Sequence, residues 1–333
     1  MFKEVIIKVI IAGSRSIKDY ALVESLIEEI VGTEKLEIST VISGHAYGVD
    51  RLGEQWAEKN GIQLDVMPAA WDDISSPDAV VKYNQRGVPY NAIAGLLRNE
   101  QMAQKGDILI LIHDGESTGS LDMLQRAEKH GLKVFKRVVD VVKHTKKVRQ
   151  SAMLDAVKWA KEMRDDETSL VLDTESCGGN KNDEIISLAV VRTCDGKMMF
   201  NSLLRPSADV KFNWYATQVH GITEAMLRNK PTIADVYDEL YELLHQKRVA
   251  AFNHTSDKRM MEQTFNKHSL DKPDINWYCI MKAYKNFTQS SAVTNLTTAC
   301  QEMNVKAGTH DALDDALAAA RIIHRIAQEY KRK

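Results

Sequence analysis

The sequence predicts an α/β protein with two sheets, the first doubly wound and parallel and the second mixed. In the first half of the chain, strand-like apolar segments alternate regularly with helical patterns, as parallel sheets require. At the start of the second half, three strand-like segments follow one another. The chain of 333 residues is long enough for two domains, since one domain takes about 100–200 residues.

The first half shows this alternation from its beginning. VIIKVIIAG (5–13) is a buried apolar run that ends in a glycine turn, and DYALVESLIEEIVG (19–32) has helical spacing. The pattern repeats to residue 139, so that each strand is followed by a helix that can cross over the sheet. Further strands are expected at 39–44, 63–69, 107–115 and 133–139, and further helices at 48–61, 94–106 and 118–131.

A change of character after residue 140 marks the predicted domain boundary. The basic stretch KHTKKVRQ (143–150) precedes a helical segment at 151–169. We therefore expect one domain at 1–140, a basic and helical connector at 141–167, and a second domain at 168–333.

The second domain opens with the strand LVLDTES (170–176). Two more strands are expected directly after it, and three consecutive strands before the helices predict a mixed sheet. The remaining expected strands are 183–193, 197–206 and 249–252, and the expected helices are about 223–228, 231–247, 257–268, 295–303 and 311–330.

Composition and charge exclude several classes of protein. The chain is 44% hydrophobic and 27% charged, which is typical of globular proteins. Its net charge of −2 does not indicate nucleic-acid binding by the whole chain, although a local basic patch is compatible with it. No apolar stretch approaches the roughly 20 residues of a membrane span, and no signal-peptide cleavage site follows the first strand. The four widely spaced cysteines favour reduced thiols in a cytoplasmic protein.

Two acidic residues, Asp173 and Glu175, lie two positions apart on the first strand of the second domain. Side chains alternate between the faces of a strand, so both carboxylates project to the same side. Two such charges are costly together unless something compensates them, and Mg²⁺ or Mn²⁺ prefers oxygen ligands. The alternative is that both acids are solvated at an exposed strand end. When the DxE motif is taken by itself, it favours this alternative.

The segment GTHDALDDALAAARII near the end of the chain changes that balance. On a helix of 3.6 residues per turn, Asp315 falls on an apolar stripe, whereas Asp314 falls on a charged stripe with Arg321. An aspartate on an apolar stripe needs a partner, because burying an unpaired carboxylate is expensive. His310 can face the same cavity, and Asp311, early in the helix, favours the positive end of its dipole.

A further aspartate, Asp257, stands shortly after the strand at 249–252. Acids at strand ends and helix starts converge at one edge of an α/β sheet. Four such carboxylates and one histidine fit a phosphodiesterase in which two metal ions, about 4 Å apart, activate water and stabilise the leaving oxygen. His310 would be the general base, because imidazole titrates near the working pH. The metal ligands would be Asp173, Glu175, Asp257 and Asp315.

These residues together resemble the DEDDh family of 3′–5′ exonucleases, which includes proofreading subunits and RNase T. The first family motif is a strand with DxE, the second has an asparagine four residues before an aspartate, and the third is His-x4-Asp. QVHGIT (218–223) and LTTACQEMNV (296–305) also resemble family segments, and the resemblance covers about 168–330. The matching motif positions are Asp173 and Glu175, Asn253 and Asp257, and His310 and Asp315.

The resemblance implies an RNase H-like mixed sheet, two Mg²⁺ or Mn²⁺ ions, and release of nucleoside 5′-monophosphates from a 3′ end. Single-stranded DNA, RNA and short oligonucleotides are all open as substrates, because sugar discrimination depends on the pocket around the 2′ position. Ser256 stands where the family often has phenylalanine, and Ser176 where threonine is common. The alternative is a nuclease-like domain that only binds nucleic acid.

Small and polar residues follow several strands of the first domain. Backbone N–H groups and helix N-termini in such loops can meet an anion, and a parallel sheet brings the loops together at its carboxyl edge. The loops predict a nucleotide-like or phosphorylated ligand, with ordinary tight turns as the alternative. The candidate ligand-binding residues are Gly13, Ser14, Arg15, Ser43, Gly44, Gly48, Asp50, Gly115, Thr118, Gly119 and Ser120.

The same elements resemble the YspA-like branch of the SLOG superfamily of Rossmann-like domains, over about 5–138. The resemblance rests on GSR after the first strand and on SGHAYGVDRLGEQWAEKNGI, LLRNEQMA and GESTGS. It implies binding of nucleotides or nucleotide-derived signals, with Arg98 and Asn99 as further contacts. A phosphoribohydrolase branch of the superfamily has a catalytic glutamate where Met123 stands, which favours a sensor or binding domain here.

We therefore expect a cytoplasmic, two-metal exonuclease that carries an N-terminal nucleotide-binding domain. The alternative is a nucleotide-signal sensor whose nuclease half acts as effector or degrades the signal. A homo-oligomer is compatible with the sequence, which does not indicate whether the two domains are coupled.

Overall fold

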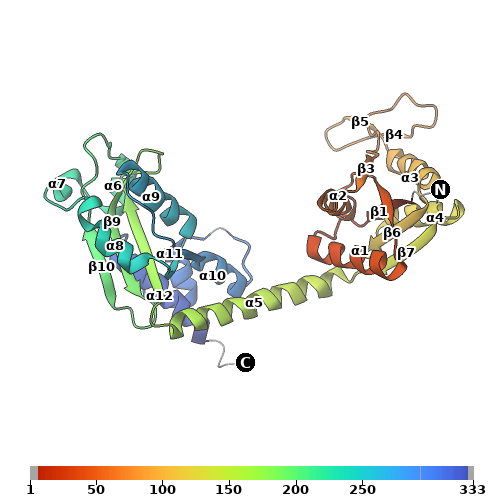
Figure 1. The fold of residues 1–333 in the computed structure, drawn as a ribbon. Helices are drawn as coiled ribbons and strands as arrows, with labels where there is room; N and C mark the ends of the chain where they lie inside the picture. Colours follow the sequence, from red (N-terminus) through yellow and green to blue (C-terminus); the bar gives the residue numbers. More distant parts are fainter. Residues whose placement is uncertain (1–6, 293, 329–333) are drawn as a thin grey trace, which may run out of the picture. The chain divides into compact units, whose positions relative to one another are not determined.

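The computed structural model describes residues 7–292 and 294–328 (Figure 1). The chain divides into two compact units, Met1–Lys146 and Lys147–Lys333, named the first and the second unit below. The division falls within the stretch that the sequence predicts as a connector. Each unit contains its own five-stranded sheet.

The sheet of the first unit is entirely parallel, in the order β3-β2-β1-β6-β7. At its centre, Ile10 of β1 pairs with Ile42 of β2 on one side and with Leu109 of β6 on the other. The five strands are β1 Ile7–Gly13, β2 Ile38–Ser43, β3 Gln63–Val66, β6 Ile108–His113 and β7 Lys133–Val138.

Helices cover both faces of this first sheet. Val9 and Ile11 of β1 pack on the face that α1 and α2 cover. Ile10 packs on the opposite face, against Met102 of α3 and Met123 of α4. This alternation confirms the predicted doubly wound sheet. The helices are α1 Tyr20–Glu34, α2 Val49–Lys59, α3 Ala94–Lys105 and α4 Thr118–Lys129.

A small hairpin between β3 and α3 is not predicted by the sequence pattern. β4 (Val81–Tyr83) pairs antiparallel with β5 (Pro89–Asn91). Each strand has three residues and β4 is exposed throughout, so no alternation of apolar and polar residues marks them. The turn is held by Asn84, whose side-chain oxygen accepts hydrogen bonds from the amides of Arg86 (2.9 Å) and Val88 (3.1 Å).

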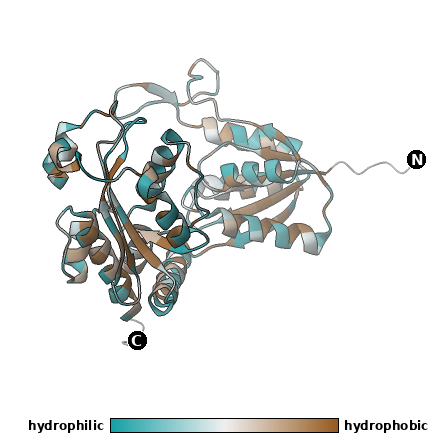
Figure 2. Ribbon diagram, turned by 60° about the vertical axis from the view of Figure 1, so that its left-hand side comes forward, coloured by the Kyte–Doolittle hydropathy of each residue, from teal (hydrophilic) through white to brown (hydrophobic). Residues whose placement is uncertain are grey.

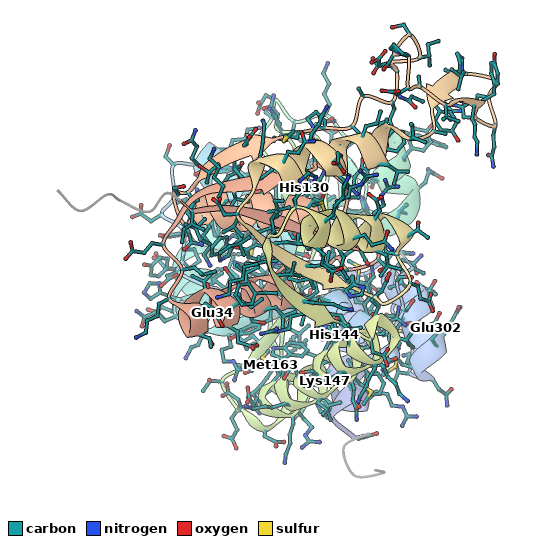
Figure 3. The ribbon with its side chains drawn as sticks, turned by 90° about the vertical axis from the view of Figure 1, so that its right-hand side faces the viewer. Glu34, His130, His144, Lys147, Met163 and Glu302 are labelled. Atoms are coloured by element: carbon teal, nitrogen blue, oxygen red, sulfur yellow. The ribbon has the colours of Figure 1, made fainter. Side chains whose placement is uncertain are left out.

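A single helix of 25 residues, α5 (Val141–Asp165), contains the predicted boundary. The sequence analysis places a helix only from residue 151, but the basic stretch before it is helical as well. Figure 3 labels His144, Lys147 and Met163 along this helix. Its last turns present Ala156, Val157, Ala160 and Met163 to the core of the second unit, with the spacing of one helix face.

The sheet of the second unit is mixed, as predicted, in the order β10-β9-β8-β11-β12. β9 runs antiparallel to both of its neighbours, whereas β11 is parallel to β8 and to β12. The strands are β8 Leu170–Ser176, β9 Ile185–Arg192, β10 Met198–Leu203, β11 Arg248–Ala251 and β12 Asn276–Cys279.

Helices also cover both faces of the second sheet. Val171 of β8 packs on the face covered by α5, α10, α11 and α12, and Leu172 packs on the face covered by α8 and α9. The hydropathy colours of Figure 2 place the apolar residues mainly on the strands and on the helix faces toward them. These helices are α8 Tyr237–Leu244, α9 His254–Lys267, α10 Ile280–Thr288, α11 Leu296–Met303 and α12 Ala312–Gln328.

Three short elements precede α8, namely α6 (Trp214–His220), α7 (Glu224–Leu227) and the 3₁₀ turn η1 (Ala234–Val236). No helix or strand is predicted at α6, β12 or α10. α6 and β12 are short and carry no clear apolar period, whereas α10 has one, with Ile280, Ala283 and Tyr284 on its buried face. Among the described residues, none of the helices combines the length and apolar character that a membrane crossing requires. All four cysteines are free thiols.

Candidate active site

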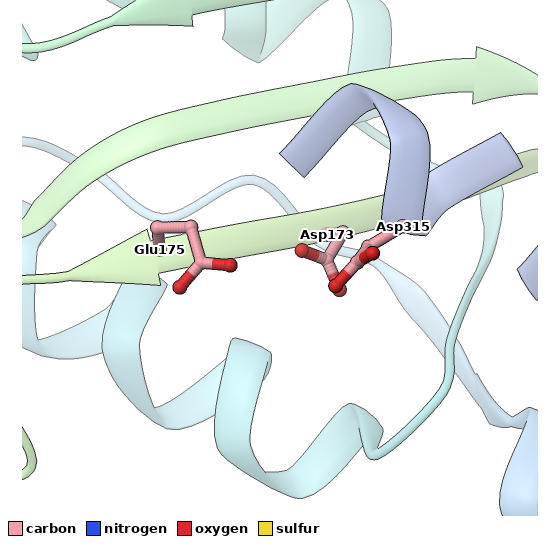
Figure 4. A group of neighbouring side chains, drawn as sticks. All are labelled: Asp173, Glu175 and Asp315. Carbon is pink, nitrogen blue, oxygen red and sulfur yellow. The ribbon is translucent and has the colours of Figure 1, made fainter. Parts of the chain in front are cut away.

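The centre of the candidate site is the carboxyl end of β8. Asp173 and Glu175 project from the same side of this strand, and Asp315 at the start of α12 meets them (Figure 4). One carboxylate oxygen of each residue lies within 4.8 Å of those of the other two. Three residues that are up to 142 positions apart therefore form one acidic cluster.

The three aspartates near the start of α12 have different environments. Asp315 lies on the buried face of the helix, as the helical phase predicts, with 9% of its surface exposed. Asp311 is exposed and caps the helix, since its carboxylate accepts hydrogen bonds from the amides of Leu313 (3.0 Å) and Asp314 (3.2 Å). Asp314 accepts a hydrogen bond from the Thr309 hydroxyl at 2.8 Å.

The loop before α12 holds Asp315 in place. The amide of His310 donates a hydrogen bond to Oδ1 of Asp315 at 3.3 Å. His310 itself is exposed. His310 has a left-handed backbone (φ 62°), a conformation that histidine adopts more readily than most residues. A Cβ at Gly308 would overlap the Asp315 carboxylate, so only glycine fits here without a shift.

Asp257 lies in the first turn of α9 and is buried. Its Oδ1 accepts two hydrogen bonds from Thr174, one from the amide (3.1 Å) and one from the hydroxyl (2.9 Å). Thr174 separates Asp173 from Glu175 on β8, so these bonds tie α9 to the strand of the acidic cluster. Asp257 itself is not one of the three residues whose oxygens converge within 4.8 Å.

Burial raises the pKa of all four carboxyl groups. The pKa of Asp173 is raised well above its usual range by burial and by the charges of Asp257, Glu175 and Asp315. Burial and the Asp315 charge raise the pKa of Glu175 to about 8, and burial raises that of Asp257 to about 6. Burial also raises the pKa of Asp315, against the effect of the His310 amide.

No lysine or arginine of the described chain compensates this charge, because none of the four carboxylates forms an ion pair within residues 7–292 and 294–328. A cluster of converging, uncompensated oxygens is the donor set that hard divalent cations prefer. The residues present therefore fit a metal site.

The first unit has a separate cavity of about 690 Å³. It lies where β1 and β6 end, at the carboxyl edge of the parallel sheet, as the sequence predicts for a ligand site. Several candidate ligand-binding residues line it, but Ser14, Ser43, Gly44, Gly48 and Gly115 do not. The candidates that line it are Gly13, Arg15, Asp50, Arg98, Asn99, Thr118, Gly119 and Ser120.

A buried ion pair forms part of the wall of this cavity. Asp50 lies 3.7 Å from Nη1 of Arg98 and accepts hydrogen bonds from the amides of Gly13 (3.2 Å) and Ala46 (3.4 Å). Burial raises the pKa of Asp50 to about 6, although the Arg98 charge opposes the shift. Arg98 also donates a hydrogen bond to the carbonyl of Gly44. This pair therefore holds β2, α2 and α3 together.

Asp114 also lines this cavity and is not among the predicted ligand-binding residues. Its carboxylate accepts hydrogen bonds from the hydroxyls of Ser14 (2.9 Å) and Ser16 (2.6 Å) and from the amides of Glu116 (3.0 Å) and Ser117 (2.9 Å). These bonds hold the pKa of Asp114 below its usual range. Two amides of the predicted anion-binding loop are thus already satisfied by a carboxylate of the chain. The Asp-Gly pair at the start of the loop is the turn signal that could have indicated this.

Comparison with known proteins finds one family for each unit. The exonuclease family RNase_T matches residues 170–323, and the YspA, cpYpsA-related SLOG family matches residues 7–73. Both predicted resemblances are therefore confirmed: within one chain, a region similar to the RNase_T exonuclease family follows a region similar to the SLOG family.

Curated relatives match about half of the chain. The uncharacterized exonuclease CP81 of Escherichia phage 186 is 25% identical over 138 residues, which are 40% of this chain and 67% of that protein. The DNA polymerase III subunit epsilon of Escherichia coli is 29% identical over 168 residues, which are 46% of this chain and 68% of the subunit. A PolC-type DNA polymerase III of Thermotoga petrophila is 28% identical over 172 residues, which are 50% of this chain but only 12% of the polymerase.

Two nuclease structures are among the solved structures similar to this chain. The nuclease domain of 3′hExo, a DEDDh family member bound to rAMP, has a TM-score of 0.43 and 21% identity and covers 48% of this chain and 92% of its own. Exonuclease X in complex with 5′ overhanging duplex DNA has a TM-score of 0.39 and 25% identity and covers 49% and 93%.

Proposed function

We propose that this protein is a metal-dependent 3′–5′ exonuclease that releases nucleoside 5′-monophosphates from single-stranded nucleic acid. The observation that carries the proposal is the convergence of Asp173, Glu175 and Asp315 within 4.8 Å, without a compensating cation in the described chain. The match of residues 170–323 to an exonuclease family supports the same chemistry.

The acidic cluster and Asp257 would hold two Mg²⁺ or Mn²⁺ ions. Bound metal supplies positive charge that activates water and stabilises the leaving oxygen. The His310 ring takes the proton of the water molecule whose oxygen attacks phosphorus, and the bond from phosphorus to the 3′ oxygen breaks. The exposed position of His310 lets its ring pass the proton on to solvent. The products are a nucleoside 5′-monophosphate and a shortened strand with a 3′ hydroxyl.

Labelled single strands of DNA and RNA test this proposal. In Mn²⁺ buffer, a 3′ label should be released at once as a mononucleotide, whereas a 5′-labelled strand should shorten stepwise. Asp315→Asn should abolish both signals, and Asp314→Asn is the matched control, because Asp314 hydrogen-bonds to Thr309 instead of joining the cluster. Release of a mononucleotide from the 5′ end, or full activity of Asp315→Asn, would contradict the proposal. The same assay decides between DNA and RNA.

We also propose that residues 1–140, which lie within the first unit, form a domain that binds a nucleotide-like ligand in its cavity. Arg15 lines the cavity and is exposed, and it forms no ion pair with any described residue, so its charge is available to a phosphate. The charge of Arg98 is already paired with Asp50, so fewer cations remain for the phosphates of the ligand. The cavity therefore suits a ligand with few phosphates better than a triphosphate.

Calorimetry with the full chain tests this second site. AMP, ADP-ribose, NAD and cyclic dinucleotides should be compared with adenosine, which lacks the phosphate. We expect binding of at least one phosphorylated ligand, and Arg15→Ala should weaken it. Degradation of the bound ligand in Mn²⁺ buffer would favour the alternative of a signal-degrading protein, and absence of binding would contradict the proposal.

Free thiols at all four cysteines suit the cytoplasm as the place of both activities.

A further inference from the structure

Large apolar side chains lie exposed on α6 and α7, where the core does not use them. Trp214 and Tyr215 are 65% and 75% exposed, and Val219 and Met226 are exposed nearby. The rings of Trp214 and Tyr215 contact each other edge to face, with centroids 5.0 Å apart and planes at 80°. Such a group of exposed aromatic and aliphatic residues typically marks a binding surface.

The aromatic pair is tied to the end of the strand that carries Asp173 and Glu175. Asn213 immediately before the pair donates its amide to the carbonyl of Cys177 at 2.8 Å, and Cys177 follows Glu175 by two positions. The side chain of Asn213 caps α6 by accepting hydrogen bonds from the amides of Tyr215 (2.9 Å) and Ala216 (3.3 Å). α6 and α7 lie together at one end of the second sheet (Figure 1).

A small buried cluster keeps this segment rigid. Ile222 and Leu227 pack in one cluster with Cys177 and Ile186. This packing anchors the chain around α6 and α7 to the end of β8 and to β9. The exposed rings therefore do not result from a loose segment. They are held outward by a helix cap on one side and by apolar packing on the other.

The charges around the rings suit a polyanion. Lys211, Arg228 and Lys230 are exposed, and none forms an ion pair within the part of the chain that the structure describes. Residues 207–230 contain two acids. Asp209 is paired with Lys267 at 3.1 Å, so only Glu224 remains without an ion pair among the described residues. Three available cations against one acid give the surface a net positive charge.

We propose that Trp214 and Tyr215 form a stacking surface for bases upstream of the terminal nucleotide of a single strand. This inference rests on the proposed exonuclease function and adds a second contact region to it. Aromatic rings stack on any base, and nearby cations neutralise the phosphates between the bases. The surface therefore favours strands of several nucleotides over a mononucleotide, without sequence preference.

Two substrates separate this surface from the reaction centre. Thymidine 5′-monophosphate p-nitrophenyl ester occupies only the terminal position, whereas (dT)8 also reaches the rings. In the full chain with Mn²⁺, Trp214→Ala/Tyr215→Ala should lower the ratio of kcat/KM for (dT)8 to that for the ester about tenfold, mainly through KM. Trp214→Phe/Tyr215→Phe should restore the ratio to within about threefold, because phenylalanine also stacks. Tyr83→Ala removes an equally exposed ring in the first unit and should leave the ratio unchanged.

A binding measurement supports the kinetic one. With EDTA, (dT)8 should quench the fluorescence of the parent protein more than that of Trp214→Phe. An equal loss of kcat/KM on both substrates in the alanine variant would show a structural role and overturn the inference. Unchanged kcat/KM values on both substrates would overturn it as well. Failure of the parent protein to cleave either substrate would instead contradict the proposed function.

Discussion

Carboxylates lie at the carboxyl edge of both sheets, but their surroundings differ. In the first unit, Asp50 has a cation and two amides as partners, all supplied by the chain. In the second unit, the neighbours of Asp173 are Glu175 and Asp315, which carry the same charge. Burial raises the pKa in both places, and only at Asp50 does a neighbouring charge oppose the effect strongly.

The difference separates a structural carboxylate from one that awaits a ligand. Burying an unpaired charge is expensive, so the chain must compensate it from within or from outside. Arg98 compensates Asp50 from within and ties elements of the first unit together. The acidic cluster has no such partner in the described chain, and a divalent cation from outside is the simplest remedy.

The largest expected effect comes from Asp173→Asn. Loss of one cluster charge should reduce exonuclease activity about a thousandfold or more, since several kcal/mol of transition-state stabilisation depend on metal held by these oxygens. Single-turnover assays with 5′-labelled strands measure it. Asp50→Asn is the control and should keep the activity within about threefold. A similar loss in both variants would remove the distinction between the two carboxylates.

The next effect concerns the stability of the first unit. Arg98→Met leaves Asp50 buried without its cation, which should reduce the free energy of unfolding by about 3 kcal/mol at pH 7.5. Because folding raises the pKa of Asp50 from 3.8 to about 6, its contribution is most favourable below pH 4 and is lost as the pH rises through 6. The destabilisation should therefore be smaller at pH 5 than at pH 7.5, as urea titrations at both pH values would show. A pH-independent loss would contradict the assigned pairing.

Metal binding should stabilise only the second unit. At a Mn²⁺ concentration of about 100 times Kd, binding adds about 2.7 kcal/mol, which raises the Tm of a unit of this size by about 5–10 °C. Calorimetry of the full chain with Mn²⁺ and with EDTA measures this shift. Asp315→Asn should lose most of the shift, whereas Arg15→Ala should keep it. If Mn²⁺ shifted the unfolding transition of the first unit instead, the metal would bind there, and the assignment of the metal site to the acidic cluster would be contradicted.

The smallest effect is expected at Asp311, the helix cap beside the cluster. Asp311→Ala removes two hydrogen bonds to helix amides and should cost about 1 kcal/mol of stability. Because its carboxylate is exposed and satisfied by amides, activity should fall far less than in Asp315→Asn. Thermal unfolding and the strand assay on the same preparations separate the two effects. A loss of activity as large as that of Asp315→Asn would place Asp311 among the metal ligands.

The sequence predicts those features that depend on local periodicity. Alternation of strands and helices predicts the first sheet, and three consecutive strands predict the mixed second sheet. The helical phase distinguishes Asp315 from Asp314 correctly. The converging position of Asp173 and Glu175 follows from the two-residue period of a strand. Short elements such as β4, β12 and α6 lack such a period, and they were accordingly not predicted.

Features that depend on contacts between distant residues could not be predicted. Asp257 is held by Thr174, which lies 83 residues earlier, and no spacing rule indicates this bond. Asp114 is satisfied by Ser14, 100 residues away, and this bond is not evident in a sequence whose small loop residues predict an open anion site. Ser14 and Ser43, which were expected to contact a ligand, are fully buried by neighbouring strands and helices.

Gly308 makes the acidic cluster dependent on a residue that carries no chemistry of its own. Any side chain at this position would have to displace the Asp315 carboxylate, whose Cγ lies 2.8 Å from where a Cβ would be. Positions 308 and 315 therefore cannot vary independently during evolution. Mutational drift at the glycine would silence the cluster while every acidic residue stayed in place, so a count of acidic residues alone would misclassify such a homologue as active.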